Sequence, residues 1–196
     1  MKNAKAQDDQ ARSVLTFWFG EGEELGSRRK QWFIKDAAFD DDIRARFTAL
    51  HEQAAAGKFV RWQAHPRDNL ALIVLLDQFP RNMFRGAARA FETDPLALAA
   101  TRHALAQDHD RDLLPVERQF IYLPLEHCES LAEQELCATL MKELEVFAPT
   151  QGVHEWAEKH LQIIRRFGRF PHRNAILGRE STTEEIEFLK QPGSGF

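Results

Sequence analysis

The sequence has few cysteines and no long apolar run, and each shortage excludes a class of protein. The two cysteines, Cys128 and Cys137, are nine residues apart without the C-x-x-C spacing of zinc or redox sites. We interpret them as reduced thiols. The longest apolar run, from Leu70 to Leu76, has seven residues, whereas a membrane-spanning helix needs about 20. The sequence therefore predicts a protein that does not enter membranes.

The N-terminus and the overall charge exclude further classes. The opening residues, M-K-N-A-K-A-Q-D-D-Q, lack the apolar segment that a secretion signal requires. The net charge is −4 with the two signs interspersed, so there is no basic field for a nucleic-acid backbone. We expect a cytoplasmic protein that binds no nucleic acid, and the sequence leaves its oligomeric state open.

Motifs for metal and cofactor chemistry are also missing. The chain has no H-E-x-x-H, no G-x-S-x-G and no glycine-rich phosphate loop. We therefore predict no cofactor and no metal. One alternative stays open, because helical bundles build metal sites from such side chains as Glu126, His127, Glu129 and His160.

What the sequence has in abundance is helical periodicity. Apolar residues recur every three or four positions, and no stretch shows the sustained alternation of a strand. We expect helices over about 9–19, 36–57, 66–79, from 94, from 114, 130–146, from beyond 149 to 168, and from 181. This predicts an all-α fold of antiparallel helix pairs, a degenerate tetratricopeptide-like stack of about eight helices. Residues 1–190 are predicted to form one domain, and 191–196 a frayed tail.

Prolines and polar residues predict where particular helices end. Pro80 should end the third helix, because the residue before a proline avoids the helical region. Pro124 should kink or break the fifth helix before Ser130. Ser130 and Glu133 have the spacing of a capping box for the helix that follows.

Two corners of similar sequence carry much of the charge. The stretch F-P-R-N-M-F-R-G ends at Gly86 and F-P-H-R-N-A-I-L-G ends at Gly178, so Arg-Asn is followed by Gly after three residues in both. The first corner contains Asp77, Gln78, Arg81, Asn82 and Arg85. It could be a structural corner in which the charges pair. Alternatively, its guanidiniums and amide form a preorganised fork for a carboxylate or phosphate.

The second cluster lies beside Pro124, the proline of the fifth helix. It contains Tyr122, Glu126, His127 and Glu129. Helical spacing turns His127 towards the core and stacks Glu126 above Tyr122. A histidine beside carboxylates can transfer protons, and His127 with Glu129 are the candidate catalytic pair. In the simpler reading, His127 only bonds a backbone carbonyl that the proline frees.

The third cluster is the second corner, with His160 one helix upstream. It contains Arg169, His172, Arg173 and Asn174, close to two further arginines. Some of these side chains cap the preceding helix. Their density also suggests an anionic ligand or a buried acid such as Asp77 or Glu129.

Three motifs together resemble the bacterial domain of unknown function 924. They are L-L-D-Q-F-P-R-N (75–82), Y-L-P-L-E-H-C-E-S (122–130) and R-F-G-R-F-P-H-R-N (166–174), and the start V-L-x-F-W-F-G (14–20) is similar too. The likeness extends from about residue 14 to 189 and implies an all-helical, tetratricopeptide-like domain without an assigned activity. The family commonly has Ser-Glu-Asp where this chain has Cys128-Glu129-Ser130, and a thiol is a weak donor. The positions that match the family pattern are Arg81, Asn82, His127, Glu129, His172, Arg173 and Asn174.

Two functions of different kinds remain open from the sequence. In the leading hypothesis, the three clusters meet at one pocket that holds a small carboxylate or phosphate ligand, with Asp77, Arg81, Asn82, Arg85, Tyr122, Glu126, His160, Arg169, His172, Arg173 and Asn174 around it. In the alternative, the helices form a scaffold for a protein partner and the charged motifs are braces. The scaffold predicts exposed aromatic residues such as Trp32 or Trp62.

Overall fold

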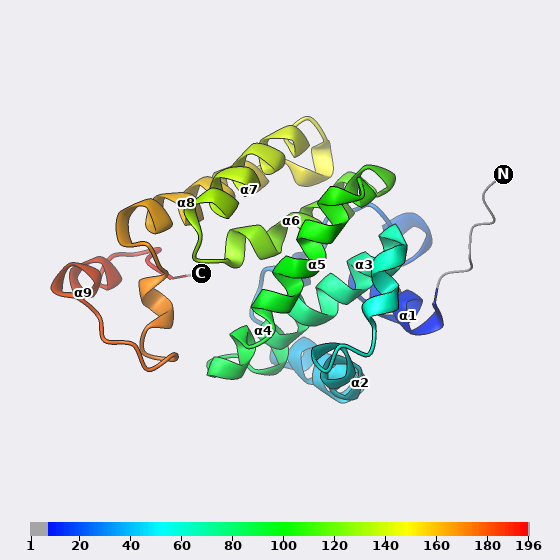
Figure 1. Cartoon of the computed structure of the whole chain (residues 1–196), viewed down its shortest axis with the longest axis horizontal. Helices are drawn as coiled ribbons and strands as arrows, with labels where there is room; N and C mark the ends of the chain where they lie inside the picture. Colours follow the sequence, from blue (N-terminus) through cyan, green and yellow to red (C-terminus); the bar gives the residue numbers. More distant parts are fainter. Residues whose placement is uncertain (1–7, 196) are drawn as a thin grey trace.

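The computed structural model describes residues 8–195, which form helices and turns without strands (Figure 1). The α-helices are α1 (Asp9–Phe19), α2 (Ala37–Ala55), α3 (Pro66–Ile73), α4 (Phe79–Met83), α5 (Asp94–Ala106), α6 (Pro115–His127), α7 (Leu131–Leu144), α8 (Val153–Phe167) and α9 (Thr183–Leu189). The all-α prediction is therefore confirmed. The expectations for residues 1–7 and for residue 196 lie outside the described residues.

Side-chain caps begin several helices where the sequence predicts them. Asp8 accepts a hydrogen bond from the backbone of α1, and Asp36 accepts two at the start of α2. Thr182 and Glu185 form a reciprocal capping box at α9. The predicted capping box at α7 is wrong, because the Ser130 side chain caps nothing. Its intended partner pairs with an arginine of α5 instead.

Pro80 does not end the third helix. The chain continues from α3 through a π-helical turn, Val74–Gln78, directly into α4. At the end of that wide turn the Phe79 N–H donates to the carbonyl of Val74, five residues earlier. Pro80 then lies in the first turn of α4, where a missing N–H is tolerated. The helix therefore does not end before Pro80 but changes from α-helical to π-helical and back to α-helical hydrogen bonding.

The fifth predicted helix is also uninterrupted, since α6 passes through Pro124. Two carbonyls of the preceding turn accept side-chain hydrogen bonds. The Thr101 hydroxyl donates to the Ile121 carbonyl at 2.9 Å, and the Cys137 thiol donates to the Tyr122 carbonyl at 3.6 Å. Neighbouring helices thus satisfy backbone groups around the proline, and the helix does not need to break there.

The helices pack as neighbouring pairs. In Figure 1, α7 and α8 lie together on one side of the molecule, α6 and α5 follow, and α3, α1, α2 and α4 form the other side. An aromatic cluster around Trp18 binds this stack, with Trp32, Phe79 and Phe120 in contact with its ring. The helix-pair stack is confirmed, and its likeness to a tetratricopeptide array stays a prediction. Within residues 8–195, none of the helices is both long and apolar enough to cross a membrane.

Candidate functional site

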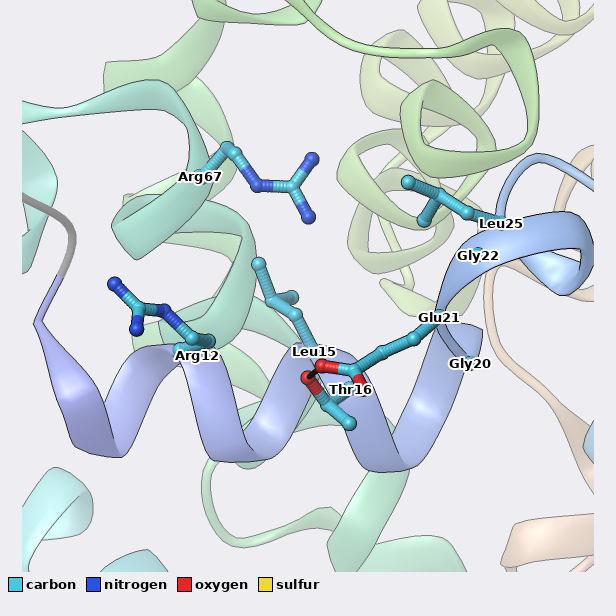
Figure 2. A pocket seen from close by; sticks show the side chains of 8 residues that line it. All are labelled: Arg12, Leu15, Thr16, Gly20, Glu21, Gly22, Leu25 and Arg67. Atoms are coloured by element: carbon cyan, nitrogen blue, oxygen red, sulfur yellow. Dashed lines mark hydrogen bonds between the residues drawn. The ribbon is translucent and has the colours of Figure 1, made fainter.

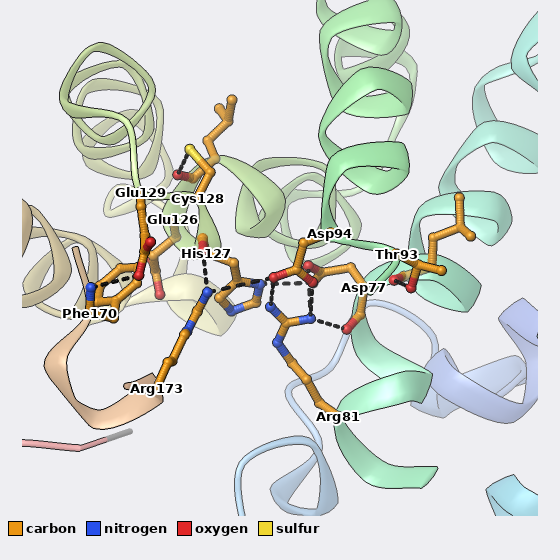
Figure 3. Close-up of polar contacts among 12 residues, drawn as sticks. Asp77, Arg81, Thr93, Asp94, Glu126, His127, Cys128, Glu129, Phe170 and Arg173 are labelled. Atoms are coloured by element: carbon orange, nitrogen blue, oxygen red, sulfur yellow. Dashed lines mark hydrogen bonds and ion pairs between the residues drawn. The ribbon is translucent and has the colours of Figure 1, made fainter. Parts of the chain in front are cut away.

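A pocket of about 400 Å³ opens where α5 begins and α6 ends. The turn Pro171–Arg173, which carries the second corner, closes its other side. Side chains of both polarities line the pocket: Ala88, Phe91, Glu92, Asp94, Pro95, Leu98, His127, Cys128, Glu129, Arg173 and Leu177. Figure 3 shows Asp94, His127, Glu129 and Arg173 of this wall, with Asp77, Arg81 and Glu126 behind them.

Asp77 is the centre of the charged network behind the wall. It lies in the π-helical turn and its side chain is 0% exposed. The carboxylate is 2.8 Å from Nδ1 of His127 and 3.3 Å from Nη1 of Arg81, and it accepts a hydrogen bond from Gln78 at 2.5 Å. Burial alone would raise the pKa of Asp77, but Arg81 and His127 outweigh it and lower the pKa to about 2. This acid is therefore ionised.

Asp94 joins the two corner motifs. Arg81 from the first corner donates to both of its carboxylate oxygens, at 2.9 and 3.0 Å. Arg173 from the second corner lies 3.6 Å from the same carboxylate (Figure 3). The sequence predicted that the two corners face one centre, and these contacts bring them together. Asp94 itself was predicted only as the start of a helix.

Arg173 is held on several sides yet keeps an unused donor. Its Nη1 donates to the His127 carbonyl at 2.9 Å. The guanidinium lies over the rings of Phe91 and Phe170, at 4.7 and 4.5 Å from their centroids. Its Nε is buried without a hydrogen-bond partner among the described residues. Burial and the charge of Arg81 lower the pKa of Arg173 to about 10, which leaves it protonated at neutral pH.

His127 stands between Asp77 and the pocket. Its Nδ1 is the nitrogen bound to Asp77, and the side chain also lines the pocket. Burial and the charge of Arg81 lower the pKa of His127, although Asp77 partly offsets them. The neutral ring therefore carries its proton on Nδ1 towards Asp77, and Nε2 is left with a lone pair.

Glu126 and His160 form a second layer behind His127. Glu126 is 4% exposed, and its carboxyl is 3.3 Å from Nδ1 of His160. Burial and the nearby charge of Asp77 raise the pKa of Glu126 to about 8, so that it is mainly protonated at neutral pH. Burial lowers the pKa of His160 to about 3. Among residues 8–195, no group of three or more His, Cys, Asp or Glu side chains is placed to hold a metal ion.

Both carboxylate oxygens of Glu129, at the rim of the pocket, accept hydrogen bonds from the protein. Arg179 donates to both of its oxygens, at 2.6 and 2.9 Å, and the Phe170 N–H donates to one of them. Burial would raise the pKa of Glu129, but these partners together lower it. Such a carboxylate fixes the second corner against α6. Its predicted catalytic role stays a prediction.

The remaining predicted ligands of the first corner face away from the pocket. Asn82 and Arg85 both donate to Asp40 of α2, at distances of 2.7 to 2.8 Å. Tyr122 is also directed elsewhere, because its hydroxyl donates to Asp110 at 2.6 Å. These side chains tie helices together.

The second corner divides its side chains in the same way. Arg169 donates to both oxygens of Glu185, and Asn174 donates to one of them at 3.3 Å. His172 is not among the side chains that line the pocket, and burial lowers its pKa to about 4. In each corner, therefore, the asparagine and one arginine brace a buried acid, while Arg81 or Arg173 turns to Asp94.

The two corners differ in local structure despite their shared sequence. The first is the short helix α4, whereas the second follows Gly168, the left-handed end of α8, and forms a 3-10 turn. The glycines that end both motifs, Gly86 and Gly178, have positive φ angles of 81° and 66°. The repeated glycine thus marks a repeated turn, and the backbone conformation before it differs between the two corners.

Four important side chains had no role in the predicted site: Asp40, Asp94, Arg179 and Glu185. Each supplies a charge partner from an element distant in sequence, so no local pattern marks it. The sequence feature that could have indicated these partners is the imbalance of charge within each motif. Each corner has more cations than acids of its own, and the motif that carries Glu129 has no arginine or lysine, so partners had to come from elsewhere.

A second pocket, of about 280 Å³, lies beside α1 (Figure 2). Arg12 and Arg67 extend into it from one side, and Leu25 and Glu21 lie on the other. Arg67 is already paired with the buried Glu117 at 2.8 Å. The carboxylate in its lining, Glu21, accepts a hydrogen bond from the Thr16 hydroxyl at 2.9 Å.

The aromatic surface that a peptide-binding scaffold requires is missing at the predicted residues. Trp32 is 8% exposed and Trp62 is 1% exposed, and both belong to the core. Their rings stack on Trp18 and Phe59 respectively.

Comparisons with known proteins agree with this fold. A family described as "Bacterial protein of unknown function (DUF924)" matches residues 14–193. The solved structure of a protein of unknown function from Agrobacterium tumefaciens is 41% identical, with a TM-score of 0.82. The match covers 92% of this chain and 97% of that one. A search among curated proteins found no match.

Proposed function

The chain belongs to this family of bacterial proteins of unknown function, DUF924, and we propose that its pocket binds a small ligand bearing a carboxylate or phosphate. In this proposal Arg173 anchors the acidic group, and the Asp77–His127 pair is positioned to act as a general base. The observation that carries the proposal is the contact of His127 with Asp77 on one side and with the pocket on the other.

Arg173 has the features of an anchor. Aromatic rings and the His127 carbonyl hold its guanidinium in one orientation. Little side-chain entropy is then lost when a ligand binds, which favours affinity. Its unused Nε donor lies beside Nη groups in the planar fork that suits an oxyanion. Asp94 competes only weakly for it, at 3.6 Å, because both Asp94 oxygens already accept from Arg81.

His127 has the protonation state that a general base needs. Asp77 accepts the Nδ1 proton and fixes the ring orientation. A neutral imidazole in this tautomer offers the Nε2 lone pair to a ligand proton. The ionised Asp77 then stabilises the imidazolium that forms, as a carboxylate does in other Asp–His pairs. Glu129 is a poorer proton carrier, because Arg179 keeps it ionised.

Binding is tested by thermal shift against a panel of small carboxylates and phosphates. A ligand at 100 times its dissociation constant stabilises the folded state by about 2.7 kcal/mol. In a domain of this size, that corresponds to a rise in Tm of roughly 5–10 °C. We expect Arg173→Gln to lose the shift and Arg165→Gln to keep it, because Arg165 pairs with an exposed glutamate outside the pocket. If no compound raises the Tm, or if both variants lose the shift equally, the proposed function is wrong.

A further inference from the structure

We infer that the ligand of this pocket is a small zwitterion of the amino-acid class, with a carboxylate, an ammonium group and an apolar side chain. The inference rests on the proposed function, since it takes Arg173 as the carboxylate anchor. It adds a cationic group to the ligand and names the residue, Glu92, that would bind it.

The pocket wall contains more carboxylates than a site for a simple anion needs. Glu92, Asp94 and Glu129 all line it. Two of them already have cations. Both oxygens of Asp94 accept from Arg81, and both oxygens of Glu129 accept from Arg179. Glu92 is exposed and has neither an ion pair nor a side-chain hydrogen bond among the described residues. It is the carboxylate available to a ligand.

Glu92 is carried on a rigid segment. It follows the short 3-10 helix Ala88–Phe91, and its N–H donates to the Arg89 carbonyl. The next residue, Thr93, is buried, and its hydroxyl donates to the Leu76 carbonyl at 2.6 Å. This bond ties the segment to the turn that carries Asp77. The backbone at Glu92 therefore has a fixed position relative to the rest of the site.

The balance of charge favours a ligand with both signs. In the wall and directly behind it, two cations and two anions sum to zero: Arg81, Arg173, Asp77 and Asp94. Glu92 adds one negative charge at the rim. A simple anion on Arg173 would double that negative charge. An ammonium group on the same ligand would instead pair with Glu92 and leave the total unchanged.

The rest of the pocket suits an apolar side chain. Phe91, Pro95, Leu98 and Leu177 line it without any polar side-chain atom. A volume of about 400 Å³ is at the small end for ligand sites, which favours a compact molecule such as an amino acid or dipeptide. Apolar ligand side chains of different lengths can pack against these residues.

Matched sets of ligands test the inference by isothermal titration calorimetry. Each set contains an apolar amino acid, its analogue without the amino group and its analogue without the carboxylate, for example leucine, 4-methylpentanoate and 3-methylbutylamine. We expect the amino acid of at least one set to bind ten or more times more tightly than either analogue. Glu92→Gln should remove the preference over the acid analogue, and Glu23→Gln, at an exposed position that does not line the pocket, should leave it. Because Glu92 is exposed, its substitution does not threaten folding.

The outcomes separate this inference from the function on which it rests. If the amine-free acids bind as tightly as the amino acids, the zwitterion is wrong and a carboxylate site remains. The zwitterion is also wrong if Glu92→Gln leaves the discrimination intact. If neither the zwitterions nor any carboxylate or phosphate binds, both proposals fail together.

Discussion

Replacing Glu126 with glutamine is expected to make the protein more stable, and increasingly so as the pH rises. Glu126 is buried behind His127, and burial together with Asp77 raises its pKa from 4.5 to about 8. The folded chain therefore keeps the Glu126 proton over a pH range in which the unfolded chain releases it. Glutamine resembles the protonated acid in size and polarity but does not titrate.

The sign and size of the effect follow from proton linkage. Below pH 4.5, Glu126 is protonated in both states and its contribution to stability is complete. Between pH 4.5 and about 8 the unfolded state binds fewer protons, so stability falls by about 1.36 kcal/mol per pH unit. The wild type should thus lose about 3 kcal/mol by pH 7 and about 5 kcal/mol above pH 8, relative to Glu126→Gln.

Urea denaturation at several pH values between about 5 and 8 measures the difference. The free energies of unfolding of the two proteins should separate steadily as the pH rises. Glu135→Gln is the matched control, because Glu135 is exposed on α7 and should give a constant difference. Histidines that titrate in this range are common to all three proteins, so their effect cancels in the comparison. Parallel curves for the wild type and Glu126→Gln would refute the reasoning.

Two further substitutions test the braces and the helix through Pro124. Asp40→Ala removes the acceptor of three hydrogen bonds between α2 and the first corner, and we expect a loss of about 2 kcal/mol in urea denaturation. Asp41→Ala is its exposed control, and equal losses would contradict the brace. Pro124→Ala should raise the free energy of unfolding by up to about 3 kcal/mol, since alanine restores a helical N–H. A lower Tm would show that α6 depends on the proline.

The secondary structure could be predicted from the sequence where local chemistry decides it. Asp8, Asp36 and Thr182 cap helices because a side-chain acceptor near free N–H groups acts over only a few residues. Proline was misjudged twice for the opposite reason. Around Pro124, side chains of two other helices satisfy the backbone, and nothing local to α6 indicates them.

The sequence motifs that form the candidate site could be identified in advance, but the ion-pair partners of their side chains could not. Arg81 and Arg173 were recognised as related, yet the acid that they share was not. Within each corner the sequence also could not say which arginine turns to Asp94. In the first corner, Asp40 of α2 selects Arg85 as the brace, and that choice depends on how α2 packs against α4.

The buried acids Asp40 and Glu126 differ in the groups that surround them. Asp40 is held by a guanidinium and an amide, and although burial would raise its pKa, those donors lower it. Glu126 is equally buried, but the charge that acts on it is that of the like-charged Asp77, and His160 beside it is neutral. If position 126 had only a structural role, an apolar residue there would make the fold more stable than the buried acid does. Under the proposed function, the raised pKa of Glu126 belongs to the environment of the Asp77–His127 pair, and its cost in stability is what Glu126→Gln would measure.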